Sequence, residues 1–306
     1  MNILVTGASG MVGSALVPIL AARGHRVVRM VRGRPAQGAQ EIYWNPDAGD
    51  IDAPSLLGFD AVVHLAGENI GAGRWTGARK RRILDSRVKG TRLLAATLSG
   101  LERPPKVMIS SSAVGYYGDR GAEILREDSS PGSGFLADVC RQWEEAASKA
   151  GEGNIRLVLV RTGMVISAGG GALARMLPAF RLGFGGRLGS GKQYISWITL
   201  EDLLEVFLFA LSQPALSGAV NAVAPTPVTN TEFTRTLGRL LSRPTLIPVP
   251  SLVIRLMFGE MGEQVLLAST RVDPARLTQA RFQFRFPELE GALRQCLGTT
   301  GSKESD

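Results

Sequence analysis

Cysteine and histidine are both scarce in this sequence, and their scarcity excludes several kinds of site. The 306 residues include two cysteines, Cys140 and Cys296, which lie far apart and without a CxxC spacing. This pattern predicts neither a disulfide framework nor a zinc site, and we expect both thiols to stay reduced. His25 and His64 cannot form a metal centre by themselves, and each lies at or inside an apolar run, so we interpret both as structural. No metal site is expected.

Long hydrophobic runs are absent as well. No apolar stretch reaches the roughly 18 to 20 residues that a membrane span needs. The sequence starts with the strand-like NILVTG, from which we expect no signal peptide. We therefore expect a cytoplasmic protein that does not bind membranes. Its composition, 44% hydrophobic and 20% charged, is typical of a globular protein with a sizeable core.

Positive charge exceeds negative charge, with 35 Lys and Arg against 27 Asp and Glu and a formal net charge of +8. The densest run is Arg79-Lys80-Arg81-Arg82. Such a balance favours anionic partners, either nucleic acid or a phosphorylated ligand, although the run could also be a solvated helix face. No aromatic residues interleave the run, so we do not expect nucleic-acid binding.

Short apolar runs typical of buried parallel strands alternate with helical patterns in the first half of the chain. The runs are Ile3–Val5, Val27–Val31, Ala61–Leu65, Val107–Ser110 and Leu157–Val160. This alternation predicts an α/β protein with a Rossmann-type doubly wound parallel sheet, whose ligands lie at the carboxyl ends of the strands. The first helix is predicted over Met11–Arg23, ended by Gly24 and kinked at Pro18.

The composition changes after Arg161, where a glycine-rich stretch precedes shorter helices separated by prolines. This change predicts a smaller C-terminal α/β substrate lobe. The expected organisation is a Rossmann domain over 1–168, a substrate lobe interleaved with it over 169–249, a C-terminal domain over 250–298 and a disordered tail over 299–306. The C-terminal domain is expected to pack against the lobe through the apolar positions Leu252, Val253, Leu256 and Met257.

A glycine motif, Gly7-Ala-Ser-Gly10-Met-Val-Gly13, follows the first predicted strand and opens the first predicted helix. In this context the glycines allow a tight turn, close approach to a pyrophosphate and close helix packing. The motif therefore predicts a dinucleotide site. The candidate residues in it are Gly7, Ser9, Gly10, Met11, Val12 and Gly13.

The end of the second predicted strand indicates which dinucleotide is bound. It reads Met30-Val31-Arg32-Gly33-Arg34, without the acid that usually takes the ribose hydroxyls of NAD. The planar guanidinium of Arg32, next to Val31 and helped by Arg34, suits a 2′-phosphate. This end of the strand predicts NADP(H), the alternative being that both arginines are solvated surface residues.

The motifs together resemble the extended short-chain dehydrogenase/reductase superfamily, in which NILVTGASGMVG, HLAG and SSSAVGYYG occupy the expected strands. Gly67-Glu68-Asn69, Ser86-Arg87, Trp143-Glu144 and FQFRFPELEGAL are similar to one atypical branch, the epimerase-family proteins with a C-terminal domain of unknown function. The resemblance reaches about Gly298. It implies cofactor contacts for Leu65, Ala66, Gly67, Arg82, Arg87 and Val165, with plain core packing as the alternative for the leucine, alanine and valine.

The stretch FLADVCRQWEE departs from the pattern of that superfamily, whose members use a Tyr-x-x-x-Lys pair on this helix. Counting back from Glu144, the tyrosine position falls on Leu136 and the lysine position on Cys140. Neither residue can act as the base or as its activator, which puts standard carbonyl reduction and 4-keto sugar epimerisation in doubt.

Polar residues around the expected cleft are the remaining candidates for chemistry. Ser112 matches the superfamily's catalytic serine best, with Ser111 as the alternative, and Tyr116 is either an acid-base residue or a packed ring. The expected substrate contacts are Glu68, Asn69 and Tyr117. We expect an NADP(H)-binding oxidoreductase or epimerase acting on an unidentified small molecule, with a non-catalytic NADP(H)-binding or sensing protein as the alternative.

Overall fold

The computed structural model describes residues 1–35 and 37–298, so the expected tail over 299–306 lies outside the described residues. The chain divides into two compact units. The first contains Met1–Tyr116, Gly134–Arg161 and Leu204–Val220, and the second contains Tyr117–Ser133, Thr162–Leu203 and residues 221–298. The domain boundaries expected after residues 168 and 249 stay a prediction.

The regular elements are short, and strands and helices alternate along the chain. The strands are β1 Asn2–Thr6, β2 Arg26–Val31, β3 Glu41–Asn45, β4 Asp50–Ile51, β5 Ala61–His64, β6 Val107–Ala113, β7 Ile124–Leu125, β8 Arg156–Thr162, β9 Met164–Ile166, β10 Tyr194–Ile195, β11 Trp197–Thr199, β12 Gly218–Ala222, β13 Val228–Thr229 and β14 Arg271–Val272. The α-helices are α1 Met11–Ala22, α2 Gly77–Ser99, α3 Phe135–Ser148, α4 Gly171–Arg181, α5 Leu200–Ser212, α6 Asn230–Leu240, α7 Ser251–Phe258, α8 Ala275–Gln279 and α9 Leu289–Leu297. Shorter turns are the 3-10 helices Ala53–Leu56, Val114–Tyr117 and Lys149–Gly153 and the π-helix Gly262–Leu267.

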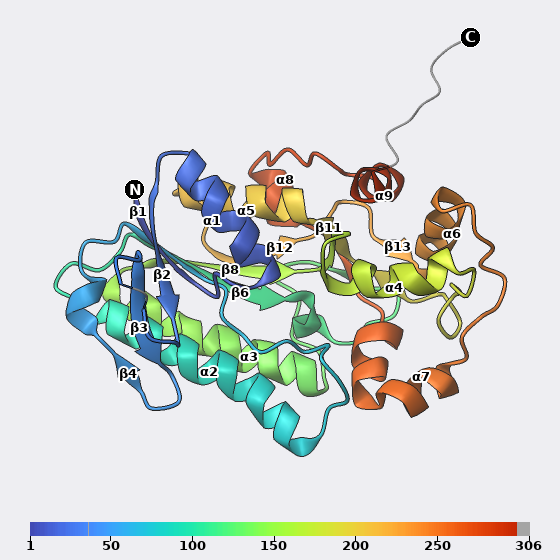
Figure 1. Ribbon diagram of the computed structural model, residues 1–306, viewed down its shortest axis with the longest axis horizontal. Coiled ribbons are helices and arrows are strands. Elements are labelled where there is room, and N and C mark those ends of the chain that lie inside the picture. The colour runs from blue at the N-terminus through green and yellow to red at the C-terminus, as the bar shows by residue number, and fades with distance from the viewer. Residues whose placement is uncertain (36, 299–306) are drawn as a thin grey trace, which may run out of the picture. The chain divides into compact units, whose positions relative to one another are not determined.

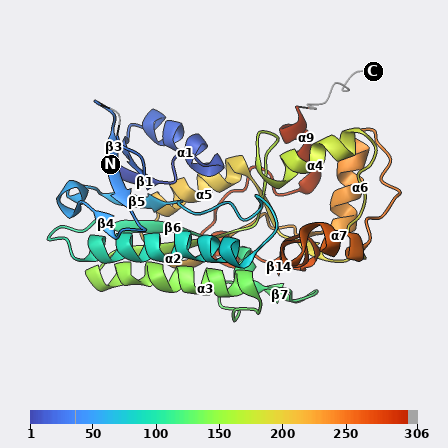
Figure 2. The same ribbon diagram turned by 60° about the horizontal axis from the view of Figure 1, so that its bottom comes forward.

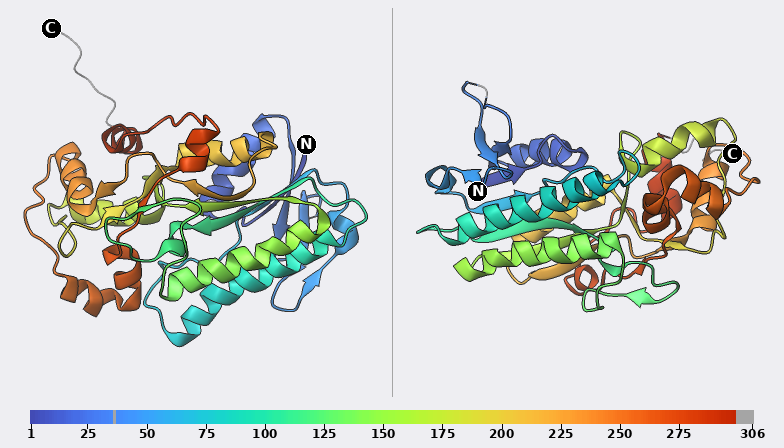
Figure 3. Two further views of the ribbon diagram at one scale, coloured as in Figure 1. Left: turned by 180° about the vertical axis from the view of Figure 1, so that it is seen from behind. Right: turned by 90° about the horizontal axis from the view of Figure 1, so that it is seen from below.

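Within the described residues, the main sheet has eight strands in the order β12-β8-β6-β5-β1-β2-β3-β4. The strands of the series β3, β2, β1, β5 and β6 run parallel to one another, whereas β4 is antiparallel to β3. Helices α1 and α5 cover one face, and α2 and α3 lie side by side on the other (Figures 1 and 2). The view from below in Figure 3 shows α2 and α3 running along each other. This arrangement confirms the predicted doubly wound fold.

The sheet is buried because its central strands are almost wholly apolar. Leu4, Val62 and Met108 come from β1, β5 and β6 and are fully buried in one core cluster with Leu94 and Leu98 of α2. Burial of each such side chain stabilises the fold by roughly 1.5 to 3 kcal/mol before entropy is counted. The five strands expected from the apolar runs are all present, because those runs form this core. Helix α1 begins at Met11 as expected and accommodates Pro18 in its interior.

The second unit has its own core. It combines residues from far apart in the sequence, including Trp197 of β11, Phe233 and Leu237 of α6, and Leu289 and Leu293 of α9. Thr199 accepts a hydrogen bond from the backbone N–H of Asp202 at 3.1 Å and so caps α5. The C-terminal helix α9 is therefore part of this core.

One packing expectation is wrong. Leu252, Val253, Leu256 and Met257 of α7 are exposed, and Ile254 is the buried residue of that helix. The apolar pattern of α7 gave no means of telling the buried side of so short a helix from the exposed one.

Candidate functional site

The glycine motif forms the turn between β1 and α1, and each glycine has a separate steric role. Gly7 has a φ of 68°, and a Cβ on it would lie 2.6 Å from the carbonyl carbon of Leu65. A Cβ on Gly13 would lie 2.3 Å from the carbonyl oxygen of Gly7. Gly10 is the N-cap of α1, has an ordinary φ of −75° and has only the Gly7 oxygen near its hypothetical Cβ, at 3.3 Å. Gly7 and Gly13 are thus required by the fold, whereas Gly10 leaves backbone open to a ligand.

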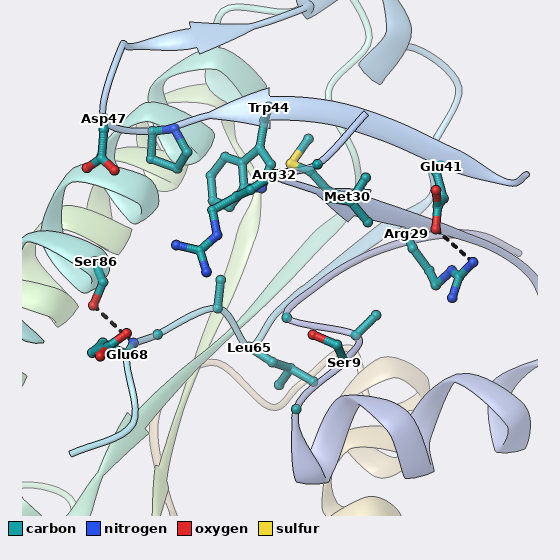
Figure 4. A pocket seen from close by; sticks show the side chains of 18 of the residues that line it. Ser9, Arg29, Met30, Arg32, Glu41, Trp44, Asp47, Leu65, Glu68 and Ser86 are labelled. Carbon is teal, nitrogen blue, oxygen red and sulfur yellow. Dashed lines mark hydrogen bonds and ion pairs between the residues drawn. The ribbon is translucent and has the colours of Figure 1, made fainter. Parts of the chain in front are cut away.

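A pocket of about 590 Å³ lies at this turn and at the carboxyl ends of β1, β2 and β5. It contains many of the residues expected to bind a cofactor (Figure 4). Of these, the pocket is lined by Gly7, Ser9, Gly10, Val31, Arg32, Leu65, Ala66, Gly67 and Arg82, together with the expected substrate contact Glu68. Met11, Val12, Gly13, Arg34 and Arg87 do not line it, although all of them belong to the same unit.

Two guanidinium groups of the pocket wall are available to a ligand. Arg32 follows β2 and Arg82 lies on α2, and both side chains are exposed. In residues 1–35 and 37–298 neither has an ion-pair or hydrogen-bond partner. In Figure 4 the guanidinium of Arg32 projects into the hollow, between Trp44 and Glu68 in this view. Such groups bind phosphate oxygens well, because the charge and the paired N–H donors match them.

Helix α2 holds the segment after β5 that forms another part of the wall. Ser86 accepts a hydrogen bond from the backbone N–H of Glu68 at 3.0 Å, and Nη1 of Arg87 donates to the Glu68 carbonyl oxygen at 3.0 Å. Arg79 donates to the Asn69 carbonyl oxygen and forms an ion pair with Glu68 at 3.5 Å. The guanidinium of Arg87 lies behind Gly67 and 5.0 Å from the ring centroid of Trp143. Arg79 of the basic run is therefore engaged in local contacts, as is Arg87 further along α2.

His64 fixes the same segment from the core. Oγ1 of Thr6 accepts from the backbone N–H groups of Leu65 and Ala66, both at 3.2 Å, and lies 2.7 Å from Nδ1 of His64. Thr6 therefore donates its own proton to Nδ1, and Nε2 carries the ring proton towards Thr91, 2.8 Å away. Burial lowers the pKa of His64 to about 4, so the ring is neutral at neutral pH. This network agrees with the structural interpretation of His64.

A second polar cluster lies at the end of β6. The hydroxyl of Ser112 donates to Oε1 of Glu144 on α3 at 2.6 Å. Nε and Nη2 of Arg161 donate to the two oxygens of that carboxylate, both at 2.8 Å. The guanidinium carbon of Arg161 lies 3.5 Å from the ring centroid of Tyr116. The structure thus brings the expected residues Ser112 and Tyr116 into one cluster.

Leu136 and Cys140 of α3 lie beside the loop that follows β6. A Cβ on Gly115 would be 3.4 Å from Cβ of Leu136 and 3.7 Å from Sγ of Cys140. Burial, together with the nearby Glu144, raises the pKa of the Cys140 thiol to about 12, so it carries no charge at neutral pH.

The other expected residues are less informative. Ser111 is half-buried on β6, and Asn69 is exposed and accepts from the backbone N–H of Gly71 at 2.9 Å. Tyr117 is fully buried in the second unit, where its hydroxyl donates to Asn221 at 2.7 Å. A substrate contact by Tyr117 therefore gains no support from its position. Val165 lies half-buried on β9, also in the second unit.

Several pocket residues escaped sequence reasoning. Glu41 and Trp44 of β3 and Pro46 and Asp47 of the turn after it line the pocket, but β3 itself was not expected. Arg29 and Asp85 also line it, from inside β2 and α2. The alternation in Glu41–Asn45, with the apolar Ile42 and Trp44 between polar neighbours, was the available signal.

In the described part of the chain, no three His, Cys, Asp or Glu side chains gather in a way that could hold a metal ion. No helix over residues 1–35 and 37–298 has both the length and the apolar character of a membrane span.

Comparison with known families gives two matches along the chain. Residues 3–223 match the NAD dependent epimerase/dehydratase family, and residues 249–296 match a domain of unknown function, DUF1731. The epimerase family protein Mb2239 of Mycobacterium bovis is 45% identical over 291 residues, which cover 95% of this chain and 96% of that protein. The human epimerase family protein SDR39U1 is 39% identical over 300 residues, covering 97% of this chain and 100% of the human protein.

Solved structures of epimerase family proteins also match this chain. The crystal structure of human SDR39U1 (isoform2) with NADPH matches with a TM-score of 0.89 and 37% identity, covering 98% of this chain and 100% of that one. A nucleoside-diphosphate sugar epimerase from Corynebacterium glutamicum matches with a TM-score of 0.80 and 35% identity, covering 98% of this chain and 58% of that one.

Proposed function

Because the chain belongs to the NAD dependent epimerase/dehydratase family, we propose that it binds NADPH in the pocket at the ends of β1, β2 and β5 and acts as an oxidoreductase or epimerase on a small molecule. The observation that carries the proposal is the pair of guanidinium groups in the pocket wall, Arg32 and Arg82, that have no partner among the described residues. A 2′-phosphate is the part of NADPH that such groups would bind.

The glycine turn supports the same ligand. Gly10 caps α1 without a side-chain hydrogen bond and lines the pocket, and the first N–H groups of a helix have no partner within the helix itself. A pyrophosphate placed there is stabilised by these donors and by the helix dipole. The human relative crystallised with NADPH has the same fold over 98% of this chain, which supports the choice of cofactor.

For the chemistry we propose Ser112 as the residue that contacts a substrate hydroxyl, with Ser111 and Tyr116 as the neighbouring candidates. Since Ser112 donates its proton to Glu144, its oxygen presents lone pairs and accepts a hydrogen bond from a ligand. Leu136 and Cys140, beside the same loop, supply neither an acid nor a cation. Proton transfer on this site would therefore proceed without the Tyr-x-x-x-Lys pair.

The test incubates the protein and NADPH or NADP⁺ with matched sets of carbonyl compounds, alcohols and nucleotide sugars. Net oxidation or reduction is followed at 340 nm, and epimerised products, which form without net cofactor turnover, are detected by NMR. Conversion of at least one compound by either readout, abolished in Ser112→Ala, supports the enzymatic function. NADPH that binds while no compound is oxidised, reduced or epimerised would favour the alternative, a non-catalytic NADP(H)-binding or sensing protein.

A further inference from the structure

Arg29 and Glu41 are direct neighbours in the sheet, and together they form one side of the pocket. They are register partners on the parallel strands β2 and β3, so their side chains project from the same face. Nη2 of Arg29 lies 2.8 Å from Oε1 of Glu41. The Glu41 side chain is 14% exposed and that of Arg29 is 47% exposed, and both line the pocket. Figure 4 shows this ion pair across the pocket from Ser86.

The Arg29 and Glu41 ion pair affects the balance of charge in the pocket wall. Four carboxylates line the pocket, and three of them are held by a cation: Glu41 by Arg29, Glu68 by Arg79 and Asp85 by Lys89. Among the residues that the structure describes, Asp47 is the acid of the wall without such a partner. The two guanidinium groups of Arg32 and Arg82 thus face one uncompensated carboxylate. Removal of Arg29 would leave two carboxylates without a cation, Glu41 and Asp47, facing the two guanidinium groups.

Without the cation beside it, the Glu41 carboxylate would act against a bound phosphate in two ways. It would repel a 2′-phosphate, which carries one to two negative charges, in a pocket that water screens only partly. It would also accept hydrogen bonds from the 2′- and 3′-hydroxyls of an unphosphorylated ribose, which is the contact that selects NAD. Glu41 therefore favours NADPH when its charge is neutralised by a cation and NADH when it is not.

We propose that Arg29 determines the choice between NADPH and NADH by neutralising Glu41, so that the carboxylate is withheld from the ribose. Arg29 is a positioning residue in this account, since it acts through Glu41. The inference rests on the proposed function, because it assumes that the pocket holds the adenosine end of NADPH. The Arg29 and Glu41 ion pair would thus be a second determinant of cofactor specificity, in addition to Arg32 after β2.

The experiment measures the dissociation constants of NADPH and NADH by calorimetry for the full chain. The variants are Arg29→Met, Glu41→Gln and the double variant Arg29→Met/Glu41→Gln. Arg23→Met is the control, since the Arg23 side chain is as exposed as that of Arg29, 48% against 47%, and its ion pair with Glu205, at 2.6 Å, does not line the pocket. Thermal unfolding of each variant is recorded alongside.

The expected result is a loss of about tenfold in the NADPH over NADH affinity ratio for Arg29→Met, which corresponds to about 1.4 kcal/mol. The double variant should recover the ratio to within about threefold of the unmutated protein, and Glu41→Gln alone should keep or raise it. Arg23→Met should leave it unchanged.

Three results would overturn the inference or its premise. An unchanged ratio in Arg29→Met would show that the ion pair does not select the cofactor. A double variant as impaired as Arg29→Met would show that Arg29 contacts the phosphate directly and that Glu41 is not involved. Failure of the unmutated protein to bind either dinucleotide would instead refute the proposed function, and is thereby distinguishable from the other two.

Discussion

The hydroxyl of Ser112 at the end of β6 donates a hydrogen bond of 2.6 Å to Glu144 on α3, 32 positions further along the chain. Glu144 is in turn bound at both oxygens by Arg161 of β8. The side chains of Arg161 and Glu144 are 4% and 10% exposed. Removing two charges from water costs free energy, which their mutual attraction offsets. If one partner is lost, the other charge stays buried without compensation and destabilises the fold.

Replacing one member of this ion pair should therefore lower the stability of the folded protein. Glu144→Gln removes the charge that compensates Arg161 and should lower the free energy of unfolding by roughly 3 to 5 kcal/mol. Glu152→Gln is the control, because Glu152 forms an exposed ion pair with Lys149 at 2.7 Å and should cost under about 1 kcal/mol. Urea unfolding followed by circular dichroism compares the two. Equal losses would show that the buried pair contributes no more than a surface pair.

Ser112 and Cys140 should differ in their effect on turnover. With a substrate identified by the 340 nm assay, Ser112→Ala should lower the rate about 100-fold or more while leaving NADPH affinity intact, because one oriented hydrogen bond is lost. Cys140→Ala should leave both rate and affinity nearly unchanged, because the raised pKa keeps this buried thiol protonated. An inactive Cys140→Ala beside an active Ser112→Ala would reveal a thiol-based chemistry instead.

His64 should make the fold sensitive to acid. Its folded pKa of about 4 lies below the ordinary value of 6.5, so the unfolded chain takes up the proton first as the pH falls. The stabilisation is thus fully present above pH 6.5 and is lost between pH 6.5 and pH 4, by on the order of 3 kcal/mol. Urea unfolding at several pH values should show this loss in the unmutated protein and a shallower one in His64→Gln. If the free energy of unfolding falls equally with pH in both proteins, His64 is not the source of the acid sensitivity.

Gly10 should be the glycine whose substitution impairs binding without impairing folding. Its φ is ordinary and its hypothetical Cβ meets one atom at 3.3 Å, so Gly10→Ala should fold with nearly normal stability. The added methyl group would face the pyrophosphate, and NADPH affinity should fall at least about tenfold. Gly33→Ala, also in the pocket wall but with no atom within 4 Å of the new Cβ, is the control in the same titration. Unimpaired binding by Gly10→Ala would place the pyrophosphate elsewhere.

Much of the fold was predictable because its strands are continuous apolar runs, and a buried parallel strand needs such a run. Strands β3, β4 and β12 could not be predicted in this way, because none of them is a continuous apolar run. Residues Asp50–Ile51 are too short to show a pattern, and Glu41–Asn45 and Gly218–Ala222 mix polar residues with apolar ones. Only their pairing with neighbouring strands makes them strands.

The residues of the candidate site also fall into those that a local sequence pattern predicts and those that depend on tertiary packing. Gly7, Ser9, Gly10 and Arg32 were predictable, because a glycine turn between strand and helix and the end of the next strand meet at one edge of a parallel sheet. The Arg29 and Glu41 ion pair was not, because it requires the register of β2 against β3. The bond from Ser112 to Glu144 likewise depends on how α3 packs on β6, which no local pattern encodes.

The central claim is that this pocket holds NADPH by its 2′-phosphate, and cofactor titration of Arg32→Ala tests it most directly. The unmutated protein should bind NADPH more tightly than NADH, and Arg32→Ala should remove most of that difference, a loss of roughly 1.5 to 3 kcal/mol. Arg34→Ala, which changes an exposed arginine outside the pocket wall, should keep the preference. Equal affinities of the unmutated protein for NADPH and NADH would contradict the claim.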